Sequence, residues 1–158
     1  MIELAPHHPG IFAETAPERT AIVMARSGAT MSYRELEMYS NRAAHLMRHL
    51  GLVRGDGVAL LMENQLHYLP IVWGALRAGL RITPLATHLT TPEADYIVSD
   101  SGAKVFITSR AKADTADHMT LSDIPPDRRL MADAATPGFE ALDDALSPMP
   151  ATPRTGTR

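Results

Sequence analysis

Cysteine does not occur in this chain of 158 residues. Without a thiol, the chain can form neither a disulfide nor a thiolate metal site, and it has no cysteine nucleophile. The disulfide-stabilised class of small secreted domains is thereby excluded, and nothing in the cysteine usage indicates an oxidising compartment. We therefore expect a cytoplasmic protein.

The chain also lacks an excess of charge of one sign and a long apolar run. Its 15 Lys and Arg residues are interspersed with 18 Asp and Glu residues, and the formal net charge is -3. No basic face for nucleic acid or anionic lipid is indicated. The apolar run at residues 69–76 is too short to span a membrane, and the first residues lack the segments of a signal peptide. We expect no nucleic-acid partner and no membrane span.

Motifs that would carry catalysis are missing as well. The sequence contains no GxxxxGK phosphate loop, no GxSxG elbow and no His, Asp and Ser set in a plausible order. Gly55-Asp56-Gly57 precedes a predicted strand, whereas a phosphate loop must follow a strand and open a helix. We interpret this segment as a turn. The residues alone therefore indicate no catalytic residue, no cofactor-binding residue and no metal ligand.

What the chain does contain is 45% apolar residues, which is enough for the core of one domain. Residues 20–24 and 30–32 flank a turn-forming segment, and this pattern predicts a hairpin. Ser32 and Glu35 stand at the spacing of a capping box, which predicts the start of a helix. Gly51 follows its last apolar residue and predicts its end.

Strand and helix patterns alternate along the rest of the chain. The apolar run at residues 58–62 is typical of a strand buried on both faces, and a helix is expected from Tyr68, with Pro70 in its first turn. The further predicted elements are a strand at 80–83, a helix capped by Thr91 and ending near Ser101, a strand at 105–108, a helix at 111–119 and a strand at 128–131. This order predicts an α/β fold with a mostly parallel sheet and helices on both faces.

The predicted organisation has three parts. Residues 1–9 form a leader, and residues 10–146 form the α/β subdomain. From Ser147 onward the chain is rich in proline and has no apolar period, so residues 147–158 are expected to be disordered.

Few side chains are candidates for a site. Asn64 follows the central predicted strand at its carboxyl end, where open α/β sheets bind ligands, so it is the polar candidate for the rim of a substrate pocket. A cap at the entry of the next helix is the favoured alternative for Asn64. His45 and His49 stand four apart, as metal ligands do, but without a third ligand we favour a solvated helix face. Trp73 is interpreted as core packing beneath the sheet.

Seven short segments occur in an order and spacing that carry a family resemblance. They lie at residues 19–23, 31–36, 41–44, 51–59, 73–79, 88–93 and 99–105. By these segments the chain resembles, from Gly10 to about Leu146, the amino-terminal part of the adenylate-forming (AMP-binding) superfamily of acyl-CoA synthetases. Residues 137–140 are similar to the segment that precedes the catalytic core of fatty-acyl-CoA ligases.

The resemblance implies a reaction in two steps, in which a fatty-acid-type carboxylate and ATP form an acyl-adenylate and the thiol of CoA then displaces AMP. ATP, Mg²⁺ and CoA are therefore implied for the full-length family. The family's Ser/Thr/Gly-rich loop ending in Pro-Lys-Gly, and its later motifs, are absent from this sequence. We expect a truncated or frameshifted reading frame, or a fragment, that stops before the phosphate loop.

Three hypotheses stay open from the sequence. The first is a ligase fragment that is inactive on its own. The second is a non-catalytic binding or interaction module derived from the same fold, with self-association through the face left exposed by truncation. The third is an independent flavodoxin-like nucleotide binder, which would need a phosphate loop that the sequence does not contain.

Overall fold

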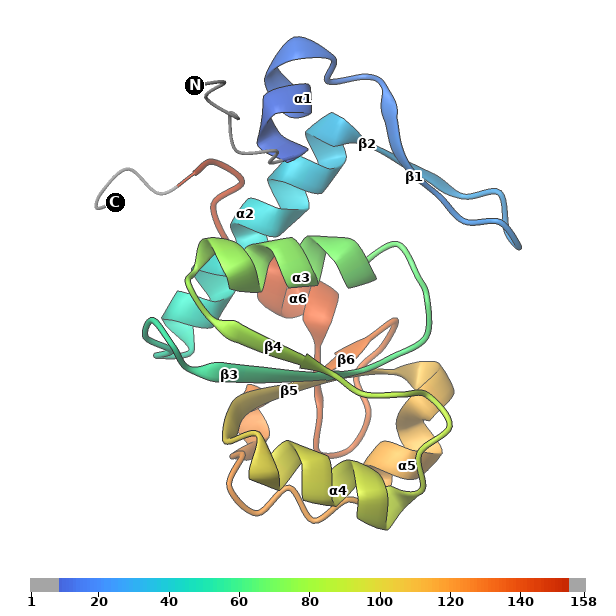
Figure 1. Cartoon of the computed structure of the whole chain (residues 1–158), viewed down its shortest axis with the longest axis vertical. Coiled ribbons are helices and arrows are strands. Elements are labelled where there is room, and N and C mark those ends of the chain that lie inside the picture. Colours follow the sequence, from blue (N-terminus) through green and yellow to red (C-terminus); the bar gives the residue numbers. More distant parts are fainter. Residues whose placement is uncertain (1–8, 154–158) are drawn as a thin grey trace, which may run out of the picture.

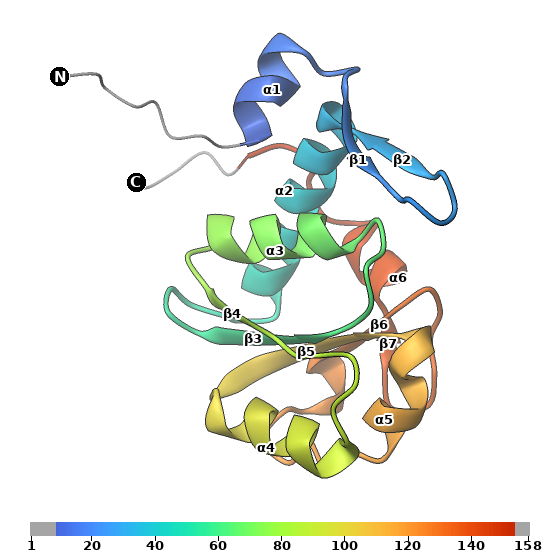
Figure 2. The same ribbon diagram turned by 45° about the vertical axis from the view of Figure 1, so that its right-hand side comes forward.

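The computed structural model of the chain describes residues 9–153. The predicted leader, apart from Pro9, lies outside the described residues, and so do residues 154–158 of the predicted tail. The described chain is a layered α/β fold, in which helices cover both faces of one sheet (Figures 1 and 2). The predicted fold class is confirmed.

The amino-terminal part forms a hairpin and one long helix. Helix α1 (Pro9–Thr15) precedes the antiparallel strands β1 (Thr20–Val23) and β2 (Thr30–Ser32), and helix α2 (Tyr33–His49) follows directly. The predicted capping box is present, because the Glu35 amide donates to Ser32 Oγ at 3.2 Å and the Ser32 amide donates to Glu35 Oε2 at 2.7 Å. These bonds satisfy amides that the first helical turn leaves free. The hydrogen bond from the Ser32 amide, and after it one that the Ser32 hydroxyl donates to the same oxygen at 2.8 Å, lower the pKa of the Glu35 carboxyl.

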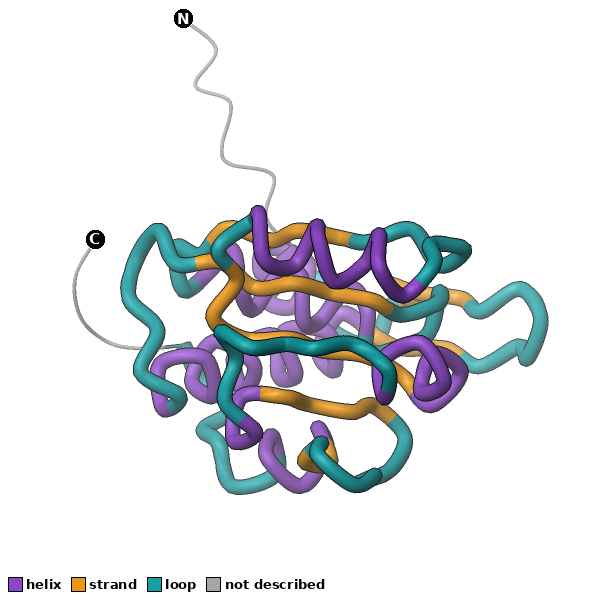
Figure 3. The backbone as a smooth tube through the Cα atoms, turned by 90° about the horizontal axis from the view of Figure 1, so that it is seen from below, coloured by secondary structure: helices purple, strands orange, loops and turns teal. Residues whose placement is uncertain are grey.

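The second part is a five-stranded parallel sheet with the order β4-β3-β5-β6-β7. Figure 3 shows its strands side by side, seen from the side of helix α4. The elements in chain order are β3 (Gly57–Leu61), α3 (Tyr68–Arg77), β4 (Arg81–Pro84), α4 (Thr91–Asp100), β5 (Ala103–Ser109), α5 (Ala113–Asp117), β6 (Arg129–Ala132), β7 (Glu140–Ala141) and α6 (Leu142–Leu146), with single 3-10 turns at Arg110–Lys112 and Pro126–Arg128.

Strand β3 is buried along its whole length, as the apolar run predicted. Its side chains alternate between the two faces of the sheet, because successive residues of a strand point to opposite sides. Leu60 joins the core cluster under α2, α3 and α6, whereas Leu61 joins the cluster under α4 and α5. The sheet therefore divides the core into two parts.

The α2/α3 side depends on a close approach of two helices. A Cβ on Gly74 of α3 would lie 2.4 Å from the Cβ of Ala43 and 2.9 Å from the carbonyl oxygen of Ser40, both in α2. Such contacts are too short for any side chain, so only glycine fits at this crossing. The missing side chain sets how closely α3 lies on α2.

Some elements differ from the sequence prediction. Helix α4 begins one residue earlier than expected, because the side chain of Thr90, and not that of Thr91, forms the capping box with Glu93. The side-chain hydrogen bond from Thr90 is the main cause of the lowered pKa of the Glu93 carboxyl. Helix α1, strand β7 and helix α6 were not predicted.

The prediction of a disordered tail does not hold for residues 147–153. The side-chain amide of Asn41 donates to the carbonyl oxygen of Ala151 at 3.0 Å, and Nε2 of His45 lies 3.0 Å from the carbonyl oxygen of Thr152. Met149 packs against the core on the same side. These contacts place residues 147–153 along α2. Because the contacting residues are far apart in the sequence, no local pattern could have predicted them.

Two sequence-based interpretations can also be compared with the fold. Trp73 is half-buried on α3 and does not belong to either core cluster, so its interpretation as a core residue was wrong. For His45 and His49, no group of three or more metal-ligating side chains occurs within residues 9–153. In the same residues, no helix combines the length and the apolarity needed to cross a membrane.

Candidate functional site

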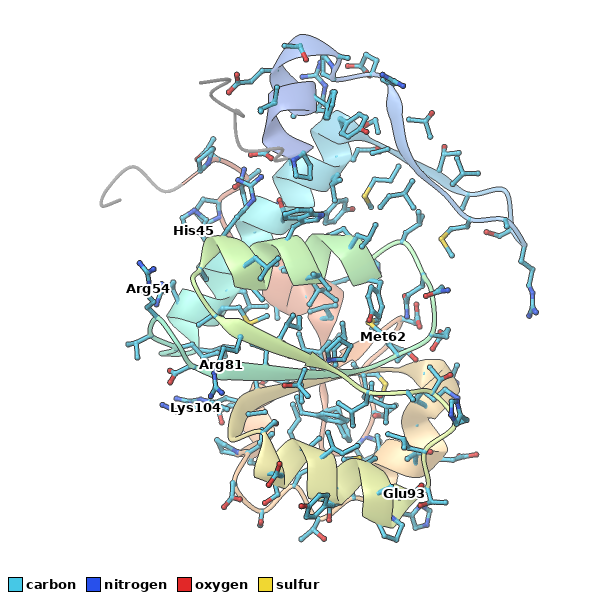
Figure 4. The ribbon with its side chains drawn as sticks, viewed as in Figure 1. His45, Arg54, Met62, Arg81, Glu93 and Lys104 are labelled. Atoms are coloured by element: carbon cyan, nitrogen blue, oxygen red, sulfur yellow. The ribbon has the colours of Figure 1, made fainter. Side chains whose placement is uncertain are left out.

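The carboxyl edge of the parallel sheet is the place to look for a site, because all strand ends of one kind meet there and the turns that follow can converge on a ligand. In Figure 4, Met62 marks this end of β3, and Arg54, Arg81 and Lys104 gather at the opposite, amino end.

At the carboxyl edge, polar side chains tie β3 to β5. The hydroxyl of Ser109 donates to Oε2 of Glu63, and the side-chain amide of Gln65 lies 3.5 Å from the other carboxylate oxygen. The buried hydroxyl of Thr108 donates to the carbonyl oxygen of Leu61 at 2.8 Å. Buried hydroxyls need such partners, because leaving them without one costs free energy. Both oxygens of the Glu63 carboxylate are therefore already engaged by protein groups.

A second polar pair lies beside the first. Nε2 of His67, at the start of α3, is 3.4 Å from Oδ1 of Asp143 in α6. The His67 ring also meets the ring of Tyr39 edge to face, at a centroid distance of 5.9 Å. Three helices contribute to this group. An imidazole next to a carboxylate can hold or move a proton, and the Asp143 side chain is more than half exposed, so the pair is accessible from solvent.

A small hollow of about 270 Å³ adjoins this pair. Its lining includes Asp133, Asp143 and Asp144. Together with Glu63 these carboxylates give the carboxyl edge an acidic character. Such a lining suits a cation or a hydrogen-bond donor better than an anion.

Asn64, the predicted rim residue, lies in the bend between β3 and α3 and is exposed. It is not the cap of α3, because the residue at the cap position is His67, so the favoured alternative was wrong. None of the hollows described here includes Asn64 in its lining. Its role at the rim of a substrate pocket stays a prediction.

A larger hollow of about 670 Å³ lies away from this edge, between α4 and the segment at residues 120–124. One carboxylate there, that of Asp95, accepts from the amides of Thr120 and Leu121, each at 3.2 Å. Burial alone would raise the pKa of Asp95, but these hydrogen bonds outweigh it and the pKa lies below its ordinary value. Asp95 thus holds a loop in place.

The amino edge is built from a turn, as predicted for Gly55-Asp56-Gly57. The carboxylate of Asp56 binds the ammonium of Lys104 at 2.8 Å and accepts from the amide of Val53 at 2.8 Å. The hydrogen bond from Lys104 is the main cause of the lowered pKa of Asp56. Arg81 Nε donates to the carbonyl oxygen of Gly55 at 2.9 Å. These contacts fix the entry into β3.

Sequence reasoning missed Ser109, His67 and Asp143. Ser109 and Glu63 are 46 residues apart, and only the parallel pairing of β3 with β5 brings them together. A strand-end signal could have pointed to Ser109, because a serine directly after a buried apolar run lies at the same edge as residues 63–65. No signal in the sequence pairs His67 with Asp143.

Comparison with known proteins gives the family. Residues 11–154 match the profile of the AMP-binding enzyme family. The chain belongs to this family. The match covers nearly all of the described residues, and therefore both sides of the sheet and both of its edges.

Relatives in the AMP-binding family are much longer than this chain. A long-chain-fatty-acid–CoA ligase, FadD13, of Mycobacterium tuberculosis is 34% identical over 114 residues, which cover 72% of this chain and 23% of the relative. The fatty acid–[acyl-carrier-protein] ligase ScoC of Streptomyces coeruleorubidus is 29% identical over 94% of this chain and 30% of its own length. The chain thus spans less than a third of these relatives.

Solved structures agree with this placement. The N-terminal domain of FACL13 from Mycobacterium tuberculosis superposes with a TM-score of 0.81 at 27% identity, over 94% of this chain and 37% of that domain. An anthranilate CoA ligase, AuaEII, gives the same TM-score at 19% identity, which shows the fold alone. This chain therefore corresponds to part of the N-terminal domain of acyl-CoA ligases.

Proposed function

We propose that this chain is part of an ATP-dependent acyl-CoA synthetase that acts on a fatty acid or a related carboxylate, and that the chain catalyses neither step on its own. The family match supports the reaction class. The substrate class is supported by the printed functions of the similar proteins, a long-chain-fatty-acid–CoA ligase and a fatty acid–[acyl-carrier-protein] ligase.

In the whole protein, a carboxylate oxygen would attack the α-phosphorus of ATP, and the bond to the leaving pyrophosphate would break. The thiol of CoA would then add to the acyl carbon, and AMP would leave with the electron pair of the mixed anhydride. The first step needs preorganised N–H groups, cations and a metal ion around the phosphates. We propose that ATP, Mg²⁺ and CoA are bound by the whole protein and that this chain holds none of them alone.

The acidic carboxyl edge is the observation that carries the proposal of inactivity. Glu63, Asp133 and Asp143 place negative charge where a nucleotide would approach the strand ends, and a triphosphate is repelled by them. The cations that follow β5 do not form a phosphate cradle, since Arg110 is exposed on a 3-10 turn and Lys112 donates to the carbonyl oxygen of Thr87 at 2.8 Å. A phosphate loop uses successive backbone amides instead.

The carboxylate oxygens of this edge do not fit Mg²⁺ well either. This ion prefers octahedral oxygen coordination, with one or two carboxylates and water or phosphate oxygens. Both oxygens of Glu63 already accept hydrogen bonds, and Asp143 is paired with His67. Within the described part of the chain, no cluster of three or more ligating side chains is available.

Exchange of radiolabelled pyrophosphate into ATP tests this proposal. The purified chain is incubated with ATP, Mg²⁺ and fatty acids from short to long chain, and the ligase FadD13 serves as the positive control. We expect no exchange above the protein-free blank with any acid. Exchange by the chain that depends on an added acid would contradict the proposed inactivity.

The second hypothesis, a non-catalytic interaction module, is favoured by one observation. Helix α3 exposes large apolar side chains, those of Leu69 and Leu76, on one side. Exposed apolar patches mark interaction surfaces. We place either form of the protein in the cytoplasm as part of the same proposal. An apolar dye whose fluorescence rises with the folded chain would support the interaction module, and a silent dye would contradict it.

A further inference from the structure

The large apolar side chains that remain exposed are distributed unevenly over the two sides of the sheet. Helices α1, α2, α3 and α6 and the hairpin of β1 and β2 lie on one side, and α4 and α5 lie on the other (Figures 1 and 2). Among residues 9–153, the α4/α5 side exposes Tyr96 and the turn at the amino edge exposes Val53. The α2/α3 side exposes five: Ile11 and Phe12 of α1, Val23 of β1, and Leu69 and Leu76 of α3. Apolar exposure is therefore concentrated on the α2/α3 side.

Helix α3 contributes an apolar face that the described chain does not cover. Leu69 and Leu76 are seven residues apart and therefore lie on one side of the helix, 42% and 48% exposed, with the half-buried Trp73 between them. We call these three residues the α3 outer face. Val72 does not belong to it, because this side chain packs against the core cluster. No element of residues 9–153 passes in front of α3 in Figures 1 and 2.

The inner side of α3 is apolar too. The buried residues there are Pro70, Ile71, Gly74 and Ala75. A helix that is apolar on all sides is normally covered on all sides. The only charged residue of α3 is Arg77, and its guanidinium donates to the carboxylate of Glu37 in α2. The α3 outer face therefore presents no charge of its own, and it suits an apolar cover.

The size of the related domain indicates what the cover is. The N-terminal domain of FACL13 matches 94% of this chain, but the match takes up only 37% of that domain. The larger part of the domain therefore has no counterpart in this chain, and a domain packs its parts around a common core. Residues 147–153 lie along α2 through the contacts of Asn41 and His45. A polypeptide that continues from this segment starts on the α2/α3 side, where the exposed apolar side chains are.

We propose that the α3 outer face, together with the exposed apolar residues of α1, is the docking surface for the remaining part of the N-terminal domain of an acyl-CoA synthetase, and that α4 keeps its solvent-facing side. The inference rests on the proposed function, because it takes the chain as part of such a synthetase, and it adds which side of the sheet the rest of the protein covers. In one continuous polypeptide this contact does not need the roughly 1,200–2,000 Å² that two separate proteins bury.

A chimera tests the docking surface. Residues 11–153 replace the corresponding part of the N-terminal domain of FACL13, and hydroxyl radicals label the exposed side chains of the chimera and of the isolated chain. Labelling of Trp73, the single tryptophan of the chain, should fall at least about threefold in the chimera, because a side chain inside an interface loses contact with water. Leu69 and Leu76 should be protected with it. Tyr96, on the other side of the sheet, should be labelled equally in both proteins.

A charge placed on the α3 outer face gives a second measurement. Leu76→Glu should lower the Tm of the chimera by at least about 4 °C, because a carboxylate would be buried there without a partner. In the isolated chain the same change should shift the Tm by less than about 2 °C, because position 76 is half exposed. Tyr96→Glu is the matched control, and it should shift the Tm of both proteins by the same amount.

Several results would overturn the proposal. A folded chimera in which Trp73 is labelled as strongly as in the isolated chain would do so, and so would protection of Tyr96 in place of Trp73. Leu76→Gln accompanies Leu76→Glu in case the charge unfolds the chimera, and equal Tm shifts of Leu76→Gln in both proteins would contradict the docking surface.

The fold of the chimera and the activity of the chain are measured separately. A chimera that stays unfolded, while the FACL13 domain folds under the same conditions, would count against the proposal, because the grafted side would then not fit its cover. Pyrophosphate exchange by the isolated chain bears on the proposed inactivity alone, whereas the labelling of Trp73 bears on the docking surface alone. A failure of the one can therefore be told apart from a failure of the other.

Discussion

On the α2/α3 side of the sheet, two helices approach each other closely because Gly74 has no side chain. On the α4/α5 side, the carboxylate of Asp95 holds a loop against helix α4. The first side is organised by apolar packing and by a backbone crossing. The second side uses hydrogen bonds at its periphery. The difference teaches that one sheet can be covered by two kinds of layer, one set by the close crossing of two helices and one in which hydrogen bonds fix a loop.

The largest expected effect comes from neighbouring leucines that point to opposite sides. Leu60→Ala and Leu61→Ala should each lower the free energy of unfolding by about 2–5 kcal/mol, through lost burial and the cavity left behind. Leu60→Ala should cost more, because α2 and α3 are held by their close crossing and cannot collapse into the cavity. Urea unfolding measures both, with the exposed Ser99→Ala as a neutral control. A larger loss for Leu61→Ala would reverse the comparison.

A smaller effect is expected when the crossing itself is changed. Gly74→Ala introduces a methyl group that meets Ala43 and Ser40, at a cost of about 1–3 kcal/mol. The better helix propensity of alanine returns up to about 1 kcal/mol. The net loss should be about 1–2 kcal/mol by thermal or urea unfolding.

The double variant Gly74→Ala with Ala43→Gly is the matched control, since it moves the methyl group from one helix to the other. In a double-mutant cycle, the double variant should recover part of the free energy of unfolding that Gly74→Ala loses. If Ala43→Gly brings no recovery, the two helices do not contact each other in the way described.

The smallest effect concerns the loop on the α4/α5 side. Asp95→Asn should lower stability by about 1 kcal/mol or less, because a neutral amide is a weaker acceptor for the amides of Thr120 and Leu121. Hydrogen exchange should quicken at these two amides and stay unchanged in α2. Asp100→Asn, exposed on the same helix, serves as the control. Faster exchange in α2 would mean that the loop is not independent of the other side.

The same loop gives a pH dependence with a definite sign. The pKa of Asp95 is lower in the folded chain than in the unfolded chain, so the unfolded chain binds more protons in acid. The stabilising contribution is complete above the unfolded pKa of about 4 and is lost as the pH falls through the lower folded pKa. Asp95→Asn should remove this part of the acid sensitivity of the Thr120 and Leu121 amides.

Local patterns predicted the parts of the fold that local physics decides. Ser32 and Glu35 form the capping box as expected, and α3 begins at Tyr68 with Pro70 in its first turn. The cap of α4 was placed at Thr91, because its neighbour Thr90 offers the same hydroxyl and only the geometry of Glu93 decides between them. Strand β7 has two residues and leaves too short a pattern to recognise.

The candidate site was much less predictable than the fold. Asn64 was placed correctly at the carboxyl edge, but the contact between Glu63 and Ser109 depends on strand pairing across a long stretch of chain. Trp73 was assigned to the core because its segment is apolar throughout, and an apolar pattern on all sides of a helix does not reveal which side the sheet covers. Which side of such a helix is buried depends on how the helices and the sheet pack against one another.

The strand order places β4 at one border of the sheet, where its outer backbone groups have no neighbouring strand in the described chain. An open border of this kind invites foreign strands to add on and can seed fibrils. Its last residue, Pro84, has no amide hydrogen to offer, and its first, Arg81, is exposed and charged. Pro84 and Arg81 therefore leave only a short part of β4 on which a foreign strand could pair and start a cross-β stack.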